Sequence, residues 1–419
     1  MQLSVVPHSK FAKTTYPPLL CGFLDLTAIG NFTPALGFCQ EVQVEQEIDQ
    51  ETVQETVQEI VQEIDQETVQ EKVETKGYQF TPVKIIQCTK VKNQDNTGTC
   101  WSFATTSFLE AEMIRLGRSE LNLSEMFIVK NIYREKAMNY VLRQGKANFG
   151  EGALAHDYIN AVSRYGVVPE SVFSGKSDDQ KQHDHAEMTS LLQSLLEGVV
   201  KIKKPTQRWK AAYSDILDSY LGTASDEFEY AGKSYTAKSF AKSIDFDPSD
   251  YVNITSYTHH PFYEKFVLEI PDNFSNGSYL NLPIDDVVAI IDNAVENGYS
   301  VAWDGDVSER SFGAAQGIAV LPASPGRRDL FRKPGKELTA TQEMRQATFE
   351  SYETTDDHLM HLTGIATDQN GTKYYMIKNS WGAVGPFNGF IHMSEAYVRL
   401  KTVAILVHKD ALPARLRKD

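Results

Sequence analysis

A single cysteine at the start of an expected helix constrains this chain most. Residues 93–116 read NQDNTGTCWSFATTSFLEAEMIRL: a polar loop, then Cys100, then an apolar pattern of helical period that stops at Gly117. The first backbone N–H groups of a helix are unpaired and its N-terminus is electropositive, so we expect Cys100 to favour the thiolate and act as a nucleophile. A lone cysteine is more often a buried structural thiol, so its neighbours must decide.

The residues around Cys100 favour a catalytic role for this cysteine. Gln94 lies close enough along the loop to place its side-chain amide beside the sulfur, as a donor to a developing oxyanion. Trp101 and Phe103 can shield the same place from water. The stretch therefore predicts acyl transfer through a cysteine.

This loop resembles that of the papain superfamily, N-Q-x-x-x-G-x-C-W. The matching residues are Asn93, Gln94, Gly98, Cys100 and Trp101. Papain has a second cysteine where this chain has Thr97, and the bleomycin hydrolase (aminopeptidase C) branch also lacks it. The resemblance implies an α+β, two-lobed papain-like fold, with a helical lobe that carries the nucleophile and a β-rich lobe.

Composition excludes other classes of protein. The net charge of -15 over 419 residues argues against a nucleic-acid surface, although a local basic run exists at 327–336 (Arg327, Arg328, Arg332, Lys333 and Lys336). Four cysteines are too few for a disulfide framework and suit a free-thiol enzyme in a reducing compartment. No stretch approaches the ~18 apolar residues of a membrane span.

The chain divides into five expected segments. Residues 1–76 carry a Q-E-x-V repeat of low complexity, expected to be disordered or partly helical. The others are a helical lobe (77–175), a helical insertion (176–255), a β-rich lobe (256–410) and a tail (411–419). In the first lobe, Asn122-Leu-Ser-Glu predicts the start of a helix through Leu142. A Gly-rich loop and a helix ending at Gly166 follow, and strands are expected at 360–366, 373–378, 389–393 and 403–408.

A thiolate needs a base, and the base needs an acceptor that orients it. Two histidines compete, His358 and His361, whose side chains point to opposite faces of a strand. The family pattern H-A-[MV]-x-L-x-G, anchored on Gly364, selects His358 and leaves His361 as a packing residue on the other face. Asn379, in K-N-S-W-G, matches the family's N-S-W-G motif; its oxygen can hold the imidazole while Trp381 covers that bond. The Cys-to-His spacing exceeds that of papain, and the helical insertion accounts for the excess.

The substrate-binding residues are expected around this centre. Gly150, Glu151 and Gly152 resemble the loop that lines one cleft wall in the family, and Glu151 is a candidate anchor for a substrate amine. Leu359 replaces a small residue after the histidine and should narrow the cleft. Histidines at 183, 185, 259 and 260 are interpreted as surface or packing residues, and neither a metal nor a cofactor is expected.

The expected activity is hydrolysis of peptide bonds through a Cys-His-Asn acyl-enzyme mechanism. The resemblance implies an aminopeptidase, a cytoplasmic location and a homo-oligomer, often a hexamer in this branch. The family's C-terminal arm, whose carboxylate meets the substrate amine, has no match in ALPARLRKD at the end of this sequence. Two alternatives stay open: an endopeptidase with an open cleft, and a non-catalytic peptide-binding protein on the same fold.

Overall fold

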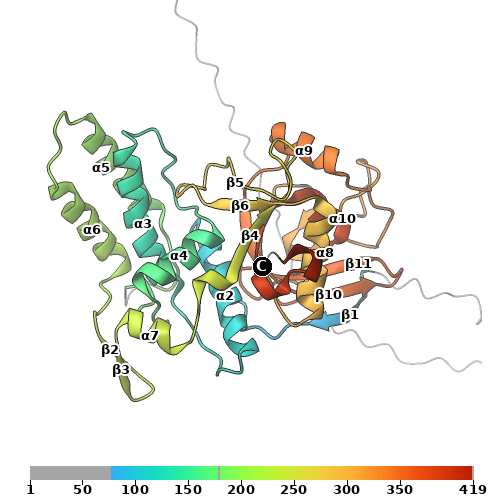
Figure 1. Ribbon diagram of the computed structural model, residues 1–419, viewed down its shortest axis with the longest axis horizontal. Helices are drawn as coiled ribbons and strands as arrows, with labels where there is room; N and C mark the ends of the chain where they lie inside the picture. Colours follow the sequence, from blue (N-terminus) through green and yellow to red (C-terminus); the bar gives the residue numbers. More distant parts are fainter. Residues whose placement is uncertain (1–76, 178–179, 418–419) are drawn as a thin grey trace, which may run out of the picture. The chain divides into compact units, whose positions relative to one another are not determined.

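The structure is a computed structural model that describes residues 77–177 and 180–417. The expectations for residues 1–76 lie outside the described residues. A group of helices forms one side of the described part, and a large mixed sheet with its own helices forms the other (Figure 1).

The sheet has eleven strands. Their order is β5-β6-β4-β13-β7-β10-β11-β12-β9-β8, and β1 pairs with β10 beside this path. Three central strands concern the site: β7 (Val301–Gly305), β10 (His358–Asp368) and β13 (Thr402–His408). The others are β1 (Phe80–Ile85), β4 (Tyr251–Thr255), β5 (Lys265–Val267), β6 (Ser278–Asn281), β8 (Phe312–Gly313), β9 (Ile318–Ala319), β11 (Lys373–Lys378) and β12 (Phe390–Ser394).

The helices cover both faces of the sheet. The helical side contains α2 (Cys100–Arg115), α3 (Glu125–Leu142), α4 (Ala155–Tyr165), α5 (Ala186–Lys201), α6 (Arg208–Leu221) and α7 (Ala237–Ser243). A short hairpin, β2 (Phe228–Tyr230) and β3 (Lys233–Tyr235), precedes α7. On the sheet side lie α8 (Ile284–Glu296), α9 (Gln342–Glu350) and α10 (Glu395–Lys401).

Two apolar cores pack against the sheet, one on each face. Side chains of α2, α3 and α4 pack with Leu359, Ala404 and Leu406 of the central strands. Side chains of α8 pack with the alternate strand residues, such as Trp303 and Met360. Residues of one strand point alternately to its two faces, so α2 and α8 lie on opposite faces of this sheet. The segment 409–416 joins the α8 core through Ala411, Leu412 and Leu416.

Several predicted elements are confirmed. The Ser124 hydroxyl accepts from Phe127 N–H and caps α3, which ends at Leu142 as expected. Helix α4 ends before Gly166, whose φ of 81° suits glycine. The four expected strands appear as β10, β11, β12 and β13, within two residues at every end.

Other boundaries differ from the expected ones. Strand β1 lies in the segment expected to belong to the helical lobe, and β4 lies at the end of the expected insertion, yet both pair within the sheet. Helix α2 was expected to bury one stripe, but every residue from Cys100 to Met113 is buried. The reason is its position between the helical side and the sheet, which leaves it no solvent-facing side.

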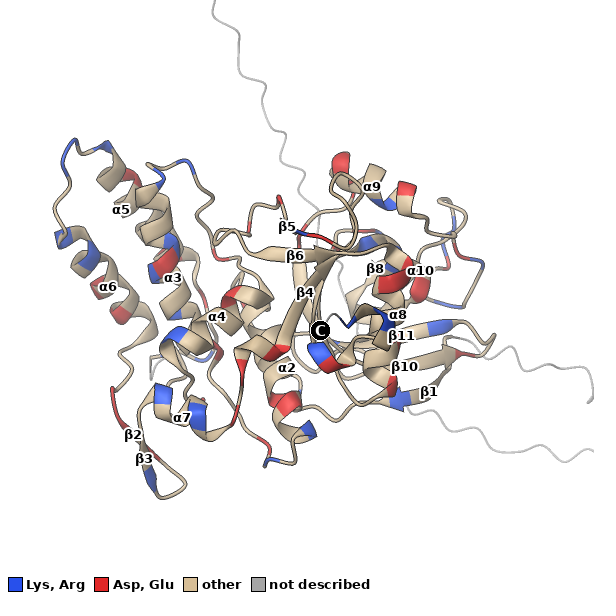
Figure 2. Ribbon diagram, in the orientation of Figure 1, with Lys and Arg blue, Asp and Glu red and all other residues tan. Residues whose placement is uncertain are grey.

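Charged side chains are scattered over the described elements in both signs (Figure 2). Within the basic run at 327–336, Asp329 pairs with Arg327 at 2.8 Å and with Lys333 at 3.7 Å. The run therefore carries part of its own neutralising charge. Among the described residues, no helix combines the length and the apolar character that crossing a membrane requires.

Candidate active site

The cysteine loop and the N-S-W-G segment are tied to each other. Gln94 N–H donates to Ser380 O at 2.8 Å, Gly382 N–H donates to Lys92 O at 3.0 Å, and Asn93 and Trp381 form an isolated bridge. The Ser380 hydroxyl donates to Gln94 Oε1 at 2.6 Å. These bonds hold the two predicted halves of the site in one register.

Cys100 is the first residue of α2. In the described part of the chain, the Cys100 N–H has no hydrogen-bond acceptor, because the first intrahelical bonds start at Ser102 and Phe103. Gln94, in the loop before this helix, is buried, and one N–H of its amide donates to Thr97 O at 2.7 Å. An amide nitrogen carries two hydrogens, so the second remains for a ligand oxygen. The arrangement offers two donors to an oxyanion.

His358 and Asn379 meet as the sequence predicts. His358 Nε2 lies 2.8 Å from Asn379 Oδ1, and both side chains are buried. The indole of Trp381 stacks on the imidazole with ring centroids 4.6 Å apart. The carbonyl oxygen of Asn379 can accept a hydrogen bond only from a nitrogen that carries a proton. This bond therefore places the proton of His358 on Nε2 and leaves Nδ1 as the basic nitrogen.

The sulfur of Cys100 lies beside the backbone of the next strand residue. Burial raises the pKa of Cys100 to about 12; a hydrogen bond from Leu359 N–H opposes this, and the carboxylates of Asp356, Asp304 and Asp272 add to it. Burial also lowers the pKa of His358 to about 4, and the hydrogen bond that His358 donates to Asn379 opposes this shift. Desolvation of both groups therefore opposes the thiolate that the helix N-terminus favours.

His361 corrects one expectation. It was placed on the face of the strand away from the nucleophile helix, but its Nδ1 lies 2.8 Å from the hydroxyl of Ser107 in α2. It is fully buried, and burial lowers its pKa well below the usual range. Because Lys378 Nζ also donates to Ser107 at 2.8 Å, His361 belongs to a buried polar cluster on the α2 side of the strand.

Glu151 has partners for both of its carboxylate oxygens. Oε2 accepts from Gly98 N–H at 2.6 Å, and Oε1 accepts from the Thr189 hydroxyl at 3.0 Å. Its backbone oxygen accepts from Trp101 Nε1 at 2.9 Å. Glu151 thus fastens the cysteine loop to the neighbouring wall. This occupation argues against the expected role as an amine anchor.

The glycines beside Glu151 differ from each other. A Cβ on Gly152 would collide with the carboxylate of Asp272, whereas a Cβ on Gly150 would meet nothing within 4 Å. Gly152 O also accepts from the ammonium of Lys136. Leu359, expected to narrow the cleft, is 3% exposed and belongs to the core around α2.

The histidines expected to be surface or packing residues fall into two groups. His183 and His185 are buried, and His185 Nδ1 lies 3.7 Å from Glu151 Oε2. Burial lowers the pKa of both to about 4. They line the back of the cysteine loop, where Asn96 N–H donates to His183 O at 3.0 Å.

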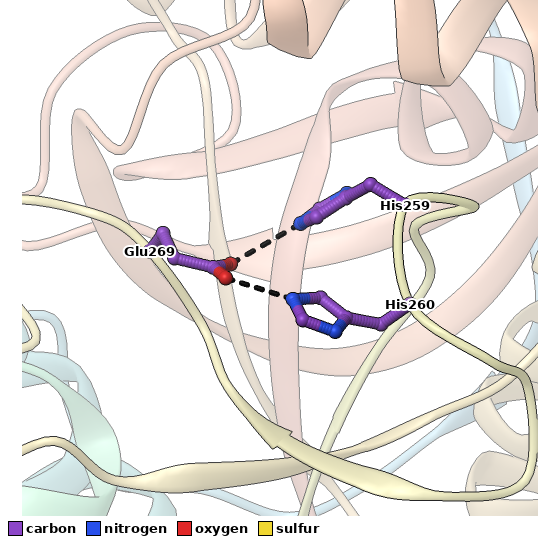
Figure 3. A group of neighbouring side chains, drawn as sticks. All are labelled: His259, His260 and Glu269. Carbon is purple, nitrogen blue, oxygen red and sulfur yellow. Dashed lines mark hydrogen bonds and ion pairs between the residues drawn. The ribbon is translucent and has the colours of Figure 1, made fainter.

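His259 and His260 share the carboxylate of Glu269, as Figure 3 shows, at 3.1 and 2.7 Å. These three side chains have the composition of a metal site. The neighbouring Gln346 accepts from Thr258 N–H through Oε1, so its Nε2 donates to His259 Nδ1. In this arrangement His259 carries its proton on Nε2, the atom that faces Glu269, and donates it to the carboxylate. The trio is a hydrogen-bonded cluster.

The sequence reasoning missed one group of residues. Asp304, the fourth of the five residues of β7, pairs directly with Leu359 of β10, and the charges of Asp304, Asp356 and Asp272 all reach Cys100. The available signal was an aspartate inside the apolar run Val301-Ala-Trp-Asp304, which an ordinary buried strand does not carry.

The comparisons with known proteins agree with this geometry. The crystal structure of PepW from Lactobacillus rhamnosis HN001 superposes with a TM-score of 0.63, at 20% identity, over 80% of this chain and 83% of that one. The fold is accordingly the α+β fold of papain-like cysteine peptidases. A family model described as papain family cysteine protease matches residues 76–182.

A second family model, the Peptidase C1-like family, matches residues 134–419, and the chain belongs to this family. Aminopeptidase C of Listeria innocua is 27% identical over 373 residues, which cover 78% of this chain and 82% of the relative. Cysteine proteinase 1, mitochondrial, of Saccharomyces cerevisiae is 22% identical over 387 residues, with coverage of 80% and 78%. The protein is a cysteine peptidase of the aminopeptidase C branch.

Proposed function

We propose that the protein is a thiol aminopeptidase whose catalytic residues are Cys100, His358, Asn379 and Gln94. The observation that carries the proposal is the bond between His358 Nε2 and Asn379 Oδ1, under Trp381 and next to a helix that begins at Cys100. The relatives named Aminopeptidase C support removal of N-terminal residues.

The reaction follows from the arrangement of these side chains. As the sulfur attacks the peptide carbonyl, its proton passes to His358 Nδ1, and Asn379 supports the imidazolium. The carbonyl oxygen becomes an oxyanion between the Cys100 N–H and the Gln94 amide. His358 then protonates the leaving amine as the C–N bond breaks. In the second half, His358 takes a proton from water, whose oxygen displaces the sulfur and releases the acyl group.

The test compares a fluorogenic peptide that has a free N-terminus with its N-acetylated twin. An aminopeptidase prefers the free amine, and Cys100→Ser abolishes both activities. Equal or better hydrolysis of the acetylated peptide would instead identify an endopeptidase with an open cleft.

The rival reading, a non-catalytic peptide-binding protein, is tested by alkylation. If His358 assists the sulfur, iodoacetamide labels Cys100 faster than Cys88 at neutral pH, and His358→Ala removes the difference. Burial raises the pKa of both thiols, so a free cysteine without a base would show no advantage. Equal labelling of the two cysteines in the unmutated protein would favour the binding protein.

Family resemblance also supports two wider proposals, a cytoplasmic location and a homo-oligomer with six subunits. Light scattering of the purified full chain would decide the second, since a hexamer has six times the mass of one chain.

A further inference from the structure

A group of carboxylates lies next to Cys100 and has no role in the reaction described above. Asp304 is 4% exposed, and its side chain shares the α2 face of the sheet with its direct strand partners Leu359 and Ala404. Directly paired side chains on one face lie about 5 Å apart. Because Leu359 also donates its N–H to the Cys100 sulfur, Asp304 stands one side chain away from the reacting atoms.

Four buried polar atoms in and beside this group have no hydrogen-bond partner among the described residues. They are Oδ1 and Oδ2 of Asp304, Oδ2 of Asp356 and the hydroxyl of Tyr257. The Asp304 and Asp356 carboxyls interact with each other, and two carboxyls can hydrogen-bond only if they share a proton. Buried acceptors without donors are rare in native proteins, so this group calls for a ligand.

Burial raises the pKa of Asp272 and Asp356 and the charge of Lys136 opposes this rise, so the chain's own cation offsets the group only in part. Lys136 is buried nearby and donates to Gly152 O. Among the residues described, its ammonium forms no ion pair within 4.0 Å with any of these carboxylates. Asp272, which covers Gly152 and accepts from Asn148 Nδ2 at 3.0 Å, adds another negative charge on the same side. The balance of charge around Asp304 favours a cation.

We propose that Asp304 and Asp356 bind an ammonium group of the substrate beside Cys100. An ammonium carries three N–H donors and no acceptor, which matches the three unpaired carboxylate oxygens. Asp356 and Asp272 are partly exposed, so the group reaches the surface from the buried Asp304. The inference rests on the proposed function, since it names the feature by which that peptidase selects its substrates.

The ammonium has two sources, the free N-terminus of the peptide or a lysine side chain. The test therefore uses two pairs of fluorogenic substrates. The first pair is leucyl and N-acetyl-leucyl aminomethylcoumarin, and the second is N-acetyl-lysyl and N-acetyl-norleucyl aminomethylcoumarin. In each pair only one member carries the charge.

Asp304→Asn and Asp356→Asn should each lower kcat/KM about 10- to 100-fold for the charged member of one pair, mainly through KM, and leave its neutral twin unchanged. If the effect appears in the first pair, the site binds the N-terminal amine. If it appears in the second pair, the site binds a lysine side chain. Asp292→Asn is the matched control, because Asp292 pairs with Lys373 and Tyr375 from α8, on the opposite face of the sheet. Equal losses for charged and neutral members, or no loss for either, overturn the proposal.

A second measurement separates this inference from the catalytic proposal. Binding of leucinamide and of N-acetyl-lysinamide to the Cys100→Ser protein is followed by calorimetry, with and without Asp304→Asn. Binding that Asp304→Asn abolishes supports the ammonium site even if no hydrolysis is found. If Cys100→Ser binds neither amide, the ammonium site is rejected whether or not the unmutated enzyme cleaves peptides. Thermal melting of each variant confirms that it is folded.

Discussion

Two acidic side chains flank the cysteine, and they differ in what satisfies them. Glu151, on the helical wall, has a protein donor on each carboxylate oxygen. Asp304, on the strand wall, has none among the described residues. Both carboxylates lie within the same fold, so we attribute the difference in their hydrogen bonding to a difference in role. Glu151 completes its bonds within the protein and is structural, whereas Asp304 is left for a group that arrives with the substrate.

Glu151 and Asp304 matter for catalysis only if Cys100 between them is an active nucleophile, so loss of its base has the largest expected effect. His358→Ala removes the base and should lower kcat by about 10³-fold for every substrate, since positioned acid–base catalysis contributes 10² to 10⁴. Steady-state kinetics with the leucyl substrate measures it. A smaller loss in His361→Ala serves as control, because His361 contacts Ser107 rather than the reacting atoms. If His361→Ala were the inactive variant, the assignment of the base would be wrong.

Replacing Glu151 and replacing Asp304 should change the free energy of unfolding in opposite directions. Glu151→Gln weakens bonds that a charged acceptor makes to Gly98 and Thr189, and should lower the free energy of unfolding by about 1–3 kcal/mol. Asp304→Asn removes a buried carboxyl that has no donor, and at pH 8 should leave that free energy equal or raise it by a similar amount. Urea unfolding of both variants at pH 8 measures the two effects. Equal destabilisation by both changes would show that Asp304, too, is structural.

The pH dependence gives the smallest expected effect. Burial, and after it the charge of Asp272, raises the pKa of Asp356 to about 7. Burial and the neighbouring Asp356 raise the pKa of Asp304 well above its usual range, so the pair still shares one proton near neutral pH. Below pH 7 a substrate ammonium must displace a further proton from Asp356, so the preference for the charged over the neutral substrate should fall up to tenfold per pH unit. The charged or titratable groups facing the pair are Asp272, Asp357, Lys136, Tyr257, Tyr279 and Cys100.

The ratio of kcat/KM within each substrate pair isolates this effect, because changes at His358 act on both members alike. Asp304→Asn removes a carboxyl neighbour of Asp356 and should shift the midpoint of the profile. A ratio that stays constant from pH 5.5 to 7.5 would contradict the ammonium site.

Most of the fold and the catalytic residues could be predicted from local sequence patterns. The loop from Asn93 to Trp101 and the N-S-W-G segment are short motifs, so their residues could be named from the sequence, and the structure brings Gln94, His358 and Asn379 together. Helix starts such as Ser124 follow from local hydrogen-bonding chemistry and were equally accessible.

The acidic site could not be predicted in the same way. Asp272, Asp304 and Asp356 come from three distant segments, and only the pairing of Asp304 with Leu359 across β7 and β10 fixes their place beside Cys100. The burial of Cys100, which opposes the thiolate, also escaped the sequence, because the helix N-terminus was visible but the desolvation was not. The complete burial of α2 was missed for a related reason, because its neighbours on the sheet lie far from it in the chain: Phe108 packs against Tyr251 of β4, and Leu359 of β10 joins the same core.

Helix α2 has a consequence for how the molecule comes apart. Its side chains join the helical side to the central strands in one continuous core. Separating the two sides would expose this helix to water along its whole buried length, so neither side has a low-energy route to open alone. Unfolding of the described part should therefore be a single cooperative event, in which the α2 amides exchange slowest with solvent and enzymatic activity disappears together with the last protected backbone.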